Sequence, residues 1–463
     1  MKKVFLFTLL LLTALAAEAQ QPFAGLRESP YAGVFQATAN PAYLISSKRP
    51  WDASLFVTNV GFGNNAIKLN LNLSDNFNDF TRVDPKNPLL TKNAIDGKIN
   101  VDVLGPAFFM KINDRHAVGF FSRIRVLGDI RGLDAKLLQS YIEDANPDKL
   151  DLIGNNYTFT LNNQEVALNA FGEIGFSWAG ELYFDGHNAI KAGASIKYIM
   201  GAGNLYAGFR DVGTATLTSN IADKKVKLQI ASDNAKVEVV NGGNNFVNFD
   251  DFNAGKLLKS DATTVGLDLG VTYEYRLDGC RNCRNKPHDL KLGLAIMDIG
   301  RIQYTANKES FKYTKTNPGS IDIPIQDLSE ETLSKVFTKH TLANKKIKTS
   351  LPTTLNLSAD YRVAGGFYLN AAGQISLTKK TDVYTVGYAN EFSFTPRFDV
   401  NGFGAYLPIS FNQVSGTNLG LGLRLGPLVV GSSTVLSNLL TKSGKEANFF
   451  VGLRFGHMSY PTK

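Results

Sequence analysis

Two cysteines and five histidines are the residues of this sequence best suited to redox or metal chemistry. Cys280 and Cys283 are separated by two residues, a spacing that suits a small disulfide ring, a redox centre or half of a zinc site. We favour the disulfide, because no βαβ pattern surrounds the pair and His288 is the single further ligand nearby. Free thiols are the remaining alternative.

The histidines have no metal-ligand spacing, and the sequence lacks both the G-x-S-x-G and the H-E-x-x-H motif. Residues 61–66 match the dinucleotide pattern G-x-G-x-x-A by letter, but a strand-like alternation follows them instead of a helix. We therefore predict a protein that is not an enzyme and that holds neither a metal nor a cofactor. The five histidines are His116, His187, His288, His340 and His457.

A third set of candidates consists of charged residues that alternate with apolar residues along predicted strands. They are Glu173, Glu181, Lys191, Lys197, Asp268, Glu274, Arg276 and Lys291. In a closed barrel this polar face lines the interior. We favour an internal salt-bridge network that fills and stiffens the barrel, and a substrate path is the alternative.

The elements that position these charges follow from a period of two that recurs along the chain. In residues 265–276, Val265, Leu267 and Leu269 share one face, whereas Gly266 and Asp268 share the other. Such alternation predicts β-strands with one apolar and one polar face. A composition of 44% hydrophobic residues with 42 glycines and a mean hydropathy of -0.10 is typical of membrane barrels, because the two faces cancel.

The first nineteen residues form a predicted signal peptide. Lys2 and Lys3 precede a short apolar run, and Ala17 and Ala19 form an A-x-A site that places the cleavage before Gln20. After this segment no run of 18 apolar residues occurs, which excludes a membrane protein built from helices. The net charge of +8 is weak evidence for an anionic partner, and we expect no binding to nucleic acid.

The connections between strands alternate between tight turns and long polar stretches, as in outer-membrane barrels. Turns are predicted at residues 113–115, 185–188, 364–366 and 395–397, and the longest polar stretches are residues 74–97, 128–163, 206–262 and 306–350. A chain that enters and leaves on the same side must cross an even number of times. Reading residues 51–73 as one strand bent at Gly61 and Gly63 gives a count of about fourteen strands.

Asn40-Pro41-Ala42, just before the first predicted strand, resembles the start of the long-chain fatty-acid transporter (FadL-like) barrels and of the PorV-like barrels of type IX secretion. Residues 266–270 and 290–300 resemble paired strands of the same barrels, and the closest resemblance is to an uncharacterised Bacteroidetes outer-membrane family. The resemblance implies a plug formed by residues 20–50 and a barrel formed by residues 51–463. The last strand, residues 447–456, departs from these relatives because seven residues follow it.

The predicted fold is thus an all-β transmembrane antiparallel barrel with an N-terminal plug, located in the outer membrane of a Gram-negative bacterium. The resemblance implies a barrel that binds or passes a hydrophobic small molecule through a plugged lumen, with outer-membrane lipid around it. The alternative is a secretion-accessory barrel that docks a secretion-system or surface protein on its outer loops, since residues 206–262 and 306–350 are long. An apolar lumen pocket favours the first hypothesis, and apolar patches on the loops favour the second.

Overall fold

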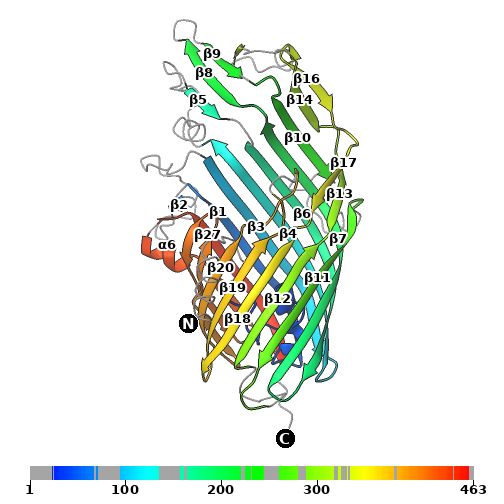
Figure 1. Cartoon of the computed structure of the whole chain (residues 1–463), viewed down its shortest axis with the longest axis vertical. Helices are drawn as coiled ribbons and strands as arrows, with labels where there is room; N and C mark the ends of the chain where they lie inside the picture. Colours follow the sequence, from blue (N-terminus) through cyan, green and yellow to red (C-terminus); the bar gives the residue numbers. More distant parts are fainter. Residues whose placement is uncertain are drawn as a thin grey trace, which may run out of the picture.

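The computed structural model describes residues 23, 25–66, 69–70, 94–134, 157–160, 164–220, 225–230, 232–243, 260–279, 288–316, 322–324, 331, 334–379, 383–441 and 443–457. Within these ranges the dominant feature is a single closed antiparallel barrel of fourteen strands, which confirms the predicted fold class. The ring closes where the first strand pairs with the last, with Trp51 opposite His457. Figure 1 shows the barrel from the side.

Two of the fourteen barrel strands each consist of two consecutive short strands. In ring order the strands are β1 (Trp51–Asn64), β3 (Ala94–Lys111), β4 (His116–Asp134), β6 (Gln164–Phe184), β7 (Asn188–Arg210), β11 (Thr263–Tyr275), β12 (Leu290–Ile299), β18 (Thr354–Ala364), β19 (Phe367–Ser376), β20 (Glu391–Val400), β21 (Phe403–Tyr406) with β22 (Ile409–Asn412), β23 (Gly416–Leu419) with β24 (Leu421–Leu425), β25 (Leu428–Ser432) and β27 (Glu446–His457).

Alternation along each strand places apolar side chains outside and polar ones inside. In β11, Val265 is 59% exposed on the outer surface, whereas its neighbour Asp268 on the other face is 2% exposed in the lumen. A soluble sandwich would bury the apolar face instead. The period of two in the sequence therefore corresponds to an apolar outer wall around a polar interior.

Most of the short connections lie at one end of the barrel, the turn end, and the longest ones lie at the other, the loop end (Figure 1). The connection from β11 to β12 is the long one at the turn end, and residues 413–415 form a short one at the loop end. The turns predicted at residues 113–115, 185–188 and 364–366 lie at the turn end. The turn predicted at 395–397 is wrong, because these residues lie inside β20. Pro396, which has no N–H to donate, lies opposite Leu407 in the break between β21 and β22, and its carbonyl accepts a hydrogen bond from Leu407 N–H at 3.0 Å. The predicted strand 51–73 is wrong at its outer end, since β1 ends at Asn64.

The loop end carries additional sheets above the barrel. β7 is long enough to pair first with β11 and then, beyond it, with β10 (Lys236–Gly243). The strands that extend this end are β14 (Phe311–Lys315) and β16 (Phe337–Thr341) beside β10, the sheet β15 (Asp322–Pro324), β9 (Lys225–Ile230), β8 (Thr214–Asn220) and β5 (Tyr157–Thr160), and the short pair β2 (Leu69–Asn70) and β26 (Ser443–Gly444).

Three pieces of chain lie within or across the barrel interior. The lumenal segment, residues 25–50, contains a 3-10 helix η1 (Gly33–Thr38) and a short helix α2 (Tyr43–Ser46), and nearly all of it is buried. The inner hairpin, β13 (Arg301–Thr305) and β17 (Lys346–Ser350), leaves the wall after β12 and returns to it before β18. The strap, residues 383–390, lies between β19 and β20 and has almost no regular secondary structure.

The remaining helix, α6 (Val435–Thr441), follows β25 and lies beside the wall at the loop end (Figure 1). In the described part of the chain, no helix combines the length and the apolar character that crossing a membrane requires.

Candidate functional site

The lumenal segment is seated on three strands through Asn40, Pro41 and Ala42. The Asn40 side-chain amide donates hydrogen bonds to the backbone carbonyls of Val271 and Leu294, at 3.1 and 3.2 Å, and its oxygen accepts one from Ala42 N–H at 2.9 Å. The predicted motif therefore contacts β11 and β12 directly. Its polar groups are satisfied although Asn40 is buried.

Glycines in the wall allow this close approach. A Cβ at Gly193 of β7 would lie 2.4 Å from Ala42 N and 2.5 Å from the Pro41 carbonyl carbon, and one at Gly270 of β11 would lie 2.0 Å from Asn40 Oδ1. No side chain fits at either position without moving the segment. Gly193 thus faces the backbone of the segment, and Gly270 faces the Asn40 side chain.

Charged and polar contacts hold the rest of the lumenal segment around most of the ring. Arg49 pairs with Asp52 of β1 at 2.6 Å, and Arg454 of β27 donates to the Tyr31 carbonyl at 2.9 Å. Lys291 of β12 donates to the Glu28 carbonyl at 3.0 Å, and its ammonium lies 4.0 Å from the centre of the Tyr43 ring. Three more hydrogen bonds join the segment to the wall: Lys191 donates to the Ser46 hydroxyl, the Ser29 hydroxyl donates to Asp399, and Asn356 donates to the Ala39 carbonyl.

Of the eight charges predicted to line the lumen, seven are buried inside the barrel and Glu181 is partly exposed near the turn end. They form more than one group. Lys191 and Arg276 both pair with Glu274 at 2.7 Å, near the turn end, while Lys197 pairs with Asp268 at 2.6 Å higher in the barrel. Lys291 belongs instead to the seat of the lumenal segment.

Two residues outside the predicted set, Arg125 and Asp298, join these charges into a central cluster. Arg125 of β4 donates to both carboxylate oxygens of Asp298 at 2.7 Å and lies 2.5 Å from Glu173. Asp298, which has a φ of 59°, also pairs with Lys197. Arg125 alternates with apolar neighbours as the predicted charges do, so the same signal applies to it. Because every ion here has a partner, the cluster fits the favoured interpretation of an internal salt-bridge network.

Above this cluster an apolar layer closes the interior. Tyr304 of the inner hairpin is fully buried, and its hydroxyl donates to Asn169 Oδ1 at 2.8 Å on β6. Val386 of the strap is also fully buried and belongs to the same apolar cluster. The hairpin and the strap therefore fill the lumen near the loop end, while the lumenal segment fills it nearer the turn end.

The strap crosses the ring to reach the wall opposite its own ends. It lies between β19 and β20, yet its carbonyls accept hydrogen bonds from β3, β4 and β7: Gly387 from Lys98 at 2.7 Å, Thr385 from Arg131 at 2.6 Å and Tyr384 from Asn204 at 3.0 Å. Tyr384 has a φ of 66°, a strained conformation for a tyrosine. Its hydroxyl donates to Glu238, and burial together with that carboxylate raises the pKa of Tyr384.

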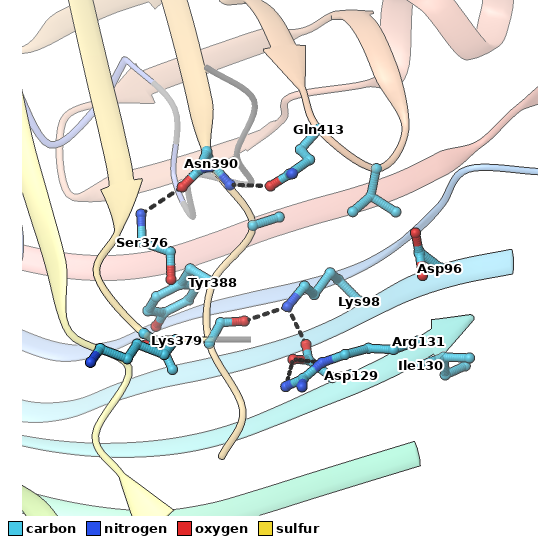
Figure 2. Close-up of a pocket in the computed structure, with 14 residues that line it drawn as sticks. Asp96, Lys98, Asp129, Ile130, Arg131, Ser376, Lys379, Tyr388, Asn390 and Gln413 are labelled. Carbon is cyan, nitrogen blue, oxygen red and sulfur yellow. Dashed lines mark hydrogen bonds and ion pairs between the residues drawn. The ribbon is translucent and has the colours of Figure 1, made fainter. Parts of the chain in front are cut away.

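A pocket of about 270 Å³ lies between the strap and the wall at the loop end (Figure 2). The residues labelled there are Asp96, Lys98, Asp129, Ile130, Arg131, Ser376, Lys379, Tyr388, Asn390 and Gln413. Asp129 bridges the two wall cations, accepting from Arg131 at 2.8 Å and from Lys98. The pocket thus combines apolar surface from Ile130 and Tyr388 with a charged edge.

Several predicted features lie outside the described residues, including the signal peptide with Ala17, Ala19 and Gln20, and the cysteines Cys280 and Cys283. His288 is described: its Nε2 lies 2.6 Å from Asp360 Oδ2. Across the ranges that the structure covers, no cluster of three histidine, cysteine or acidic side chains is arranged to hold a metal ion. These predictions therefore remain predictions.

Residues 41–433 match the model of a protein family described as a family of unknown function, DUF5723. No curated protein sequence matches the chain. Among solved structures, the chain is similar to a FadL homologue of Pseudomonas aeruginosa, with 11% identity, 95% of this chain and 98% of that chain covered, and a TM-score of 0.42.

It is also similar to the toluene transporter TodX of Pseudomonas putida, with 10% identity, 95% and 94% coverage and a TM-score of 0.32. A third similar structure is the translocator domain of the autotransporter NalP of Neisseria meningitidis, with 8% identity, 88% coverage of each chain and a TM-score of 0.31. At these TM-scores the similarities assign neither a ligand nor a mechanism to this chain.

Proposed function

Because the chain belongs to the DUF5723 family of unknown function, we propose its role from its own contacts: it is an outer-membrane barrel of a Gram-negative bacterium that binds a hydrophobic small molecule at its loop end and admits it to a plugged lumen. We propose no catalytic step for it.

The outer wall supports a location in a lipid bilayer. Large apolar side chains are exposed on strands from all around the ring, among them Val60, Phe120, Phe176, Ile196, Leu294 and Phe449. Such a surface is unfavourable in water, and it suits the hydrocarbon region of a membrane. A closed ring also pairs every strand edge, as a membrane-spanning sheet requires.

The observation that carries the ligand-binding proposal is the pocket between the strap and β3 and β4 (Figure 2). At about 270 Å³ it is close to the lower size of small-molecule sites. Ile130, Val414 and the Tyr388 ring supply apolar contacts, and Lys98 and Arg131 supply hydrogen-bond donors beside them. This combination suits a small molecule that has a hydrophobic part and a polar group.

The lumen below the pocket is closed by side chains and by inserted chain, so passage requires one of the inserts to move. The docking alternative depends on residues 206–262 and 306–350, much of which lies outside the described residues. It stays a prediction.

The proposal is tested by fractionating the membranes of cells that produce the protein and measuring its gel mobility with and without heating. We expect it in the outer-membrane fraction, with a faster-migrating folded form that heating abolishes. Mass spectrometry of small molecules extracted from the purified folded barrel should then identify a hydrophobic compound. Soluble, heat-insensitive protein would refute the barrel assignment, and a folded barrel that retains only bulk lipid would refute ligand binding.

A further inference from the structure

The strap and the lumenal segment close the same lumen, but they are held in different ways. The lumenal segment rests against wall glycines and has polar contacts to strands around most of the ring, among them β1, β7, β11, β12, β18, β20 and β27. Moving it would expose many buried polar groups at once. The lumenal segment is therefore built as a fixed part of the barrel.

The strap, by contrast, is held to the far wall mainly through carbonyl oxygens. Lys98 donates to Gly387 and Arg131 donates to Thr385, and both of these cations line the pocket (Figure 2). The same two side chains thus bind the strap and face the space that a ligand would occupy. A ligand that offers better acceptors than peptide carbonyls competes directly for these donors.

The charges around the pocket indicate which acceptor competes best. Three cations, Lys98, Arg131 and Lys379, line the pocket. Lys98 and Arg131 already pair with Asp129, and Arg131 also pairs with Glu165 at 2.5 Å, whereas Lys379 forms no ion pair within the described contacts. The bonds from Lys98 and Arg131 to the strap carbonyls already have a charged donor, and an anionic oxygen adds the attraction of a second, opposite charge. An acidic group would therefore displace the strap carbonyls.

We propose that this pocket binds the acidic group, a carboxylate or a phosphate, of an amphipathic molecule, and that the acid takes over the hydrogen bonds of Lys98 and Arg131 and so releases the strap. This inference rests on the proposed function, because it assumes that a small molecule enters the pocket. The strap, and not the lumenal segment, is then the part that opens.

Release of the strap is measurable at Val386, which is fully buried in the apolar layer. In a background in which Cys280 and Cys283 are replaced by serine, Val386→Cys reports opening as a faster rate of maleimide labelling in lipid nanodiscs. The matched control is Ile45→Cys, a buried position of the lumenal segment. The probes are dodecanoate, dodecyl phosphate and the neutral dodecanol, and the amount of each probe retained by washed nanodiscs is measured by mass spectrometry.

We expect at least one acidic probe to raise the labelling rate of Val386→Cys about 100-fold, which corresponds to the loss of the two charge-assisted hydrogen bonds from Lys98 and Arg131, while Ile45→Cys stays unlabelled. The two acids show whether a carboxylate or a phosphate fits. Dodecanol is expected to leave the rate unchanged. The heat-modifiable gel mobility of every variant establishes that it is folded.

Two substitutions distinguish the hydrogen bonds that hold the strap from the charges that bind the acid. Lys98→Met should raise the labelling rate without any probe about tenfold and remove most of the response to acid. Lys379→Met changes a lining cation that, within the described contacts, donates no hydrogen bond to the strap, so it should weaken retention of the acid while the rate without probe stays the same.

Retained acid with no change in the Val386→Cys labelling rate would overturn the proposal that the acid releases the strap, and it would leave the proposed function standing. Equal acceleration by dodecanol, or labelling of Ile45→Cys in place of Val386→Cys, would overturn it as well. If none of the probes is retained, the proposed ligand binding fails together with the inference.

Discussion

The close contact between the lumenal segment and the wall predicts what a methyl group added at Gly193 would do to stability. In Gly193→Ala the new methyl group would lie 2.4 Å from Ala42 N and 2.5 Å from the Pro41 carbonyl carbon. Both atoms belong to the backbone, so no side-chain rotation relieves the clash. Overpacking of this kind costs about 1–3 kcal/mol, which is roughly a 5- to 150-fold change in the unfolding equilibrium.

Gly373→Ala is the matched control, because it is also a glycine of a barrel strand and its Cβ would meet nothing nearer than 3.9 Å. Replacing a glycine where space allows reduces the entropy of the unfolded chain and stabilises by about 0.4–1 kcal/mol. The two substitutions are therefore expected to differ in sign as well as in size.

The assay is urea unfolding of the barrel in lipid vesicles, followed by the fluorescence of Trp51 and Trp178, which both lie in strands. Gly193→Ala should lower the urea midpoint, and Gly373→Ala should keep or raise it. Trypsin cleavage after Arg27 and Lys48 in the folded state reports separately whether the segment has left its seat. If Gly193→Ala is as stable and as protected as Gly373→Ala, the segment is not seated on β7 as described.

Further predictions concern the interior, the outer wall and one turn. Arg125→Met leaves Asp298 buried without its bidentate partner, and we expect a loss of about 3–5 kcal/mol of folding free energy in the same urea assay. Ile196→Arg places a charge on the lipid-facing side of β7 and should cost about 2–4 kcal/mol if it lies near the bilayer midplane. Hydrogen bonds from Asn188 and from His187 N–H lower the pKa of Asp185 to about 2. The carboxylate therefore stabilises the fold at pH values above its ordinary pKa, and this stabilisation disappears as the pH falls through about 2. Asp185→Ala should remove this pH dependence of the urea midpoint.

The first two of these predictions each have a control in the same barrel. Arg115→Met removes an exposed arginine at the turn end, and its effect should stay within about 0.5 kcal/mol. Ile112→Arg puts the same charge at the exposed edge of the wall and should cost about 0–1 kcal/mol. Equal losses for Arg125→Met and Arg115→Met would contradict the central cluster. Equal losses of folding free energy for Ile196→Arg and Ile112→Arg would contradict the lipid-facing position of Ile196. An unchanged pH profile of the urea midpoint in Asp185→Ala would contradict the role of that carboxylate in the turn.

The sequence determined the strands and the side of the wall that each residue faces. Strand geometry turns the residue-by-residue alternation into two faces, so Asp268 and Val265 are assigned to opposite sides before any contact is known. The same rule gave the buried positions of Lys197 and Glu274. The turn prediction at residues 395–397 rested on Pro396 as a turn signal and failed, because Phe394, Pro396 and Phe398 continue the alternation of the strand.

Only the tertiary structure decided which residues meet across the lumen. The pairing of Arg125 with Asp298, and that of Lys98 with the Gly387 carbonyl, join residues far apart in the chain, and they depend on how many strands close the ring and how the strands are staggered. The strap and the inner hairpin were not predicted, because irregular and short segments have no periodicity that distinguishes a chain folded into the lumen from one that lies above it. Local alternation therefore determines the wall of this barrel, while its closure in space determines what fills it.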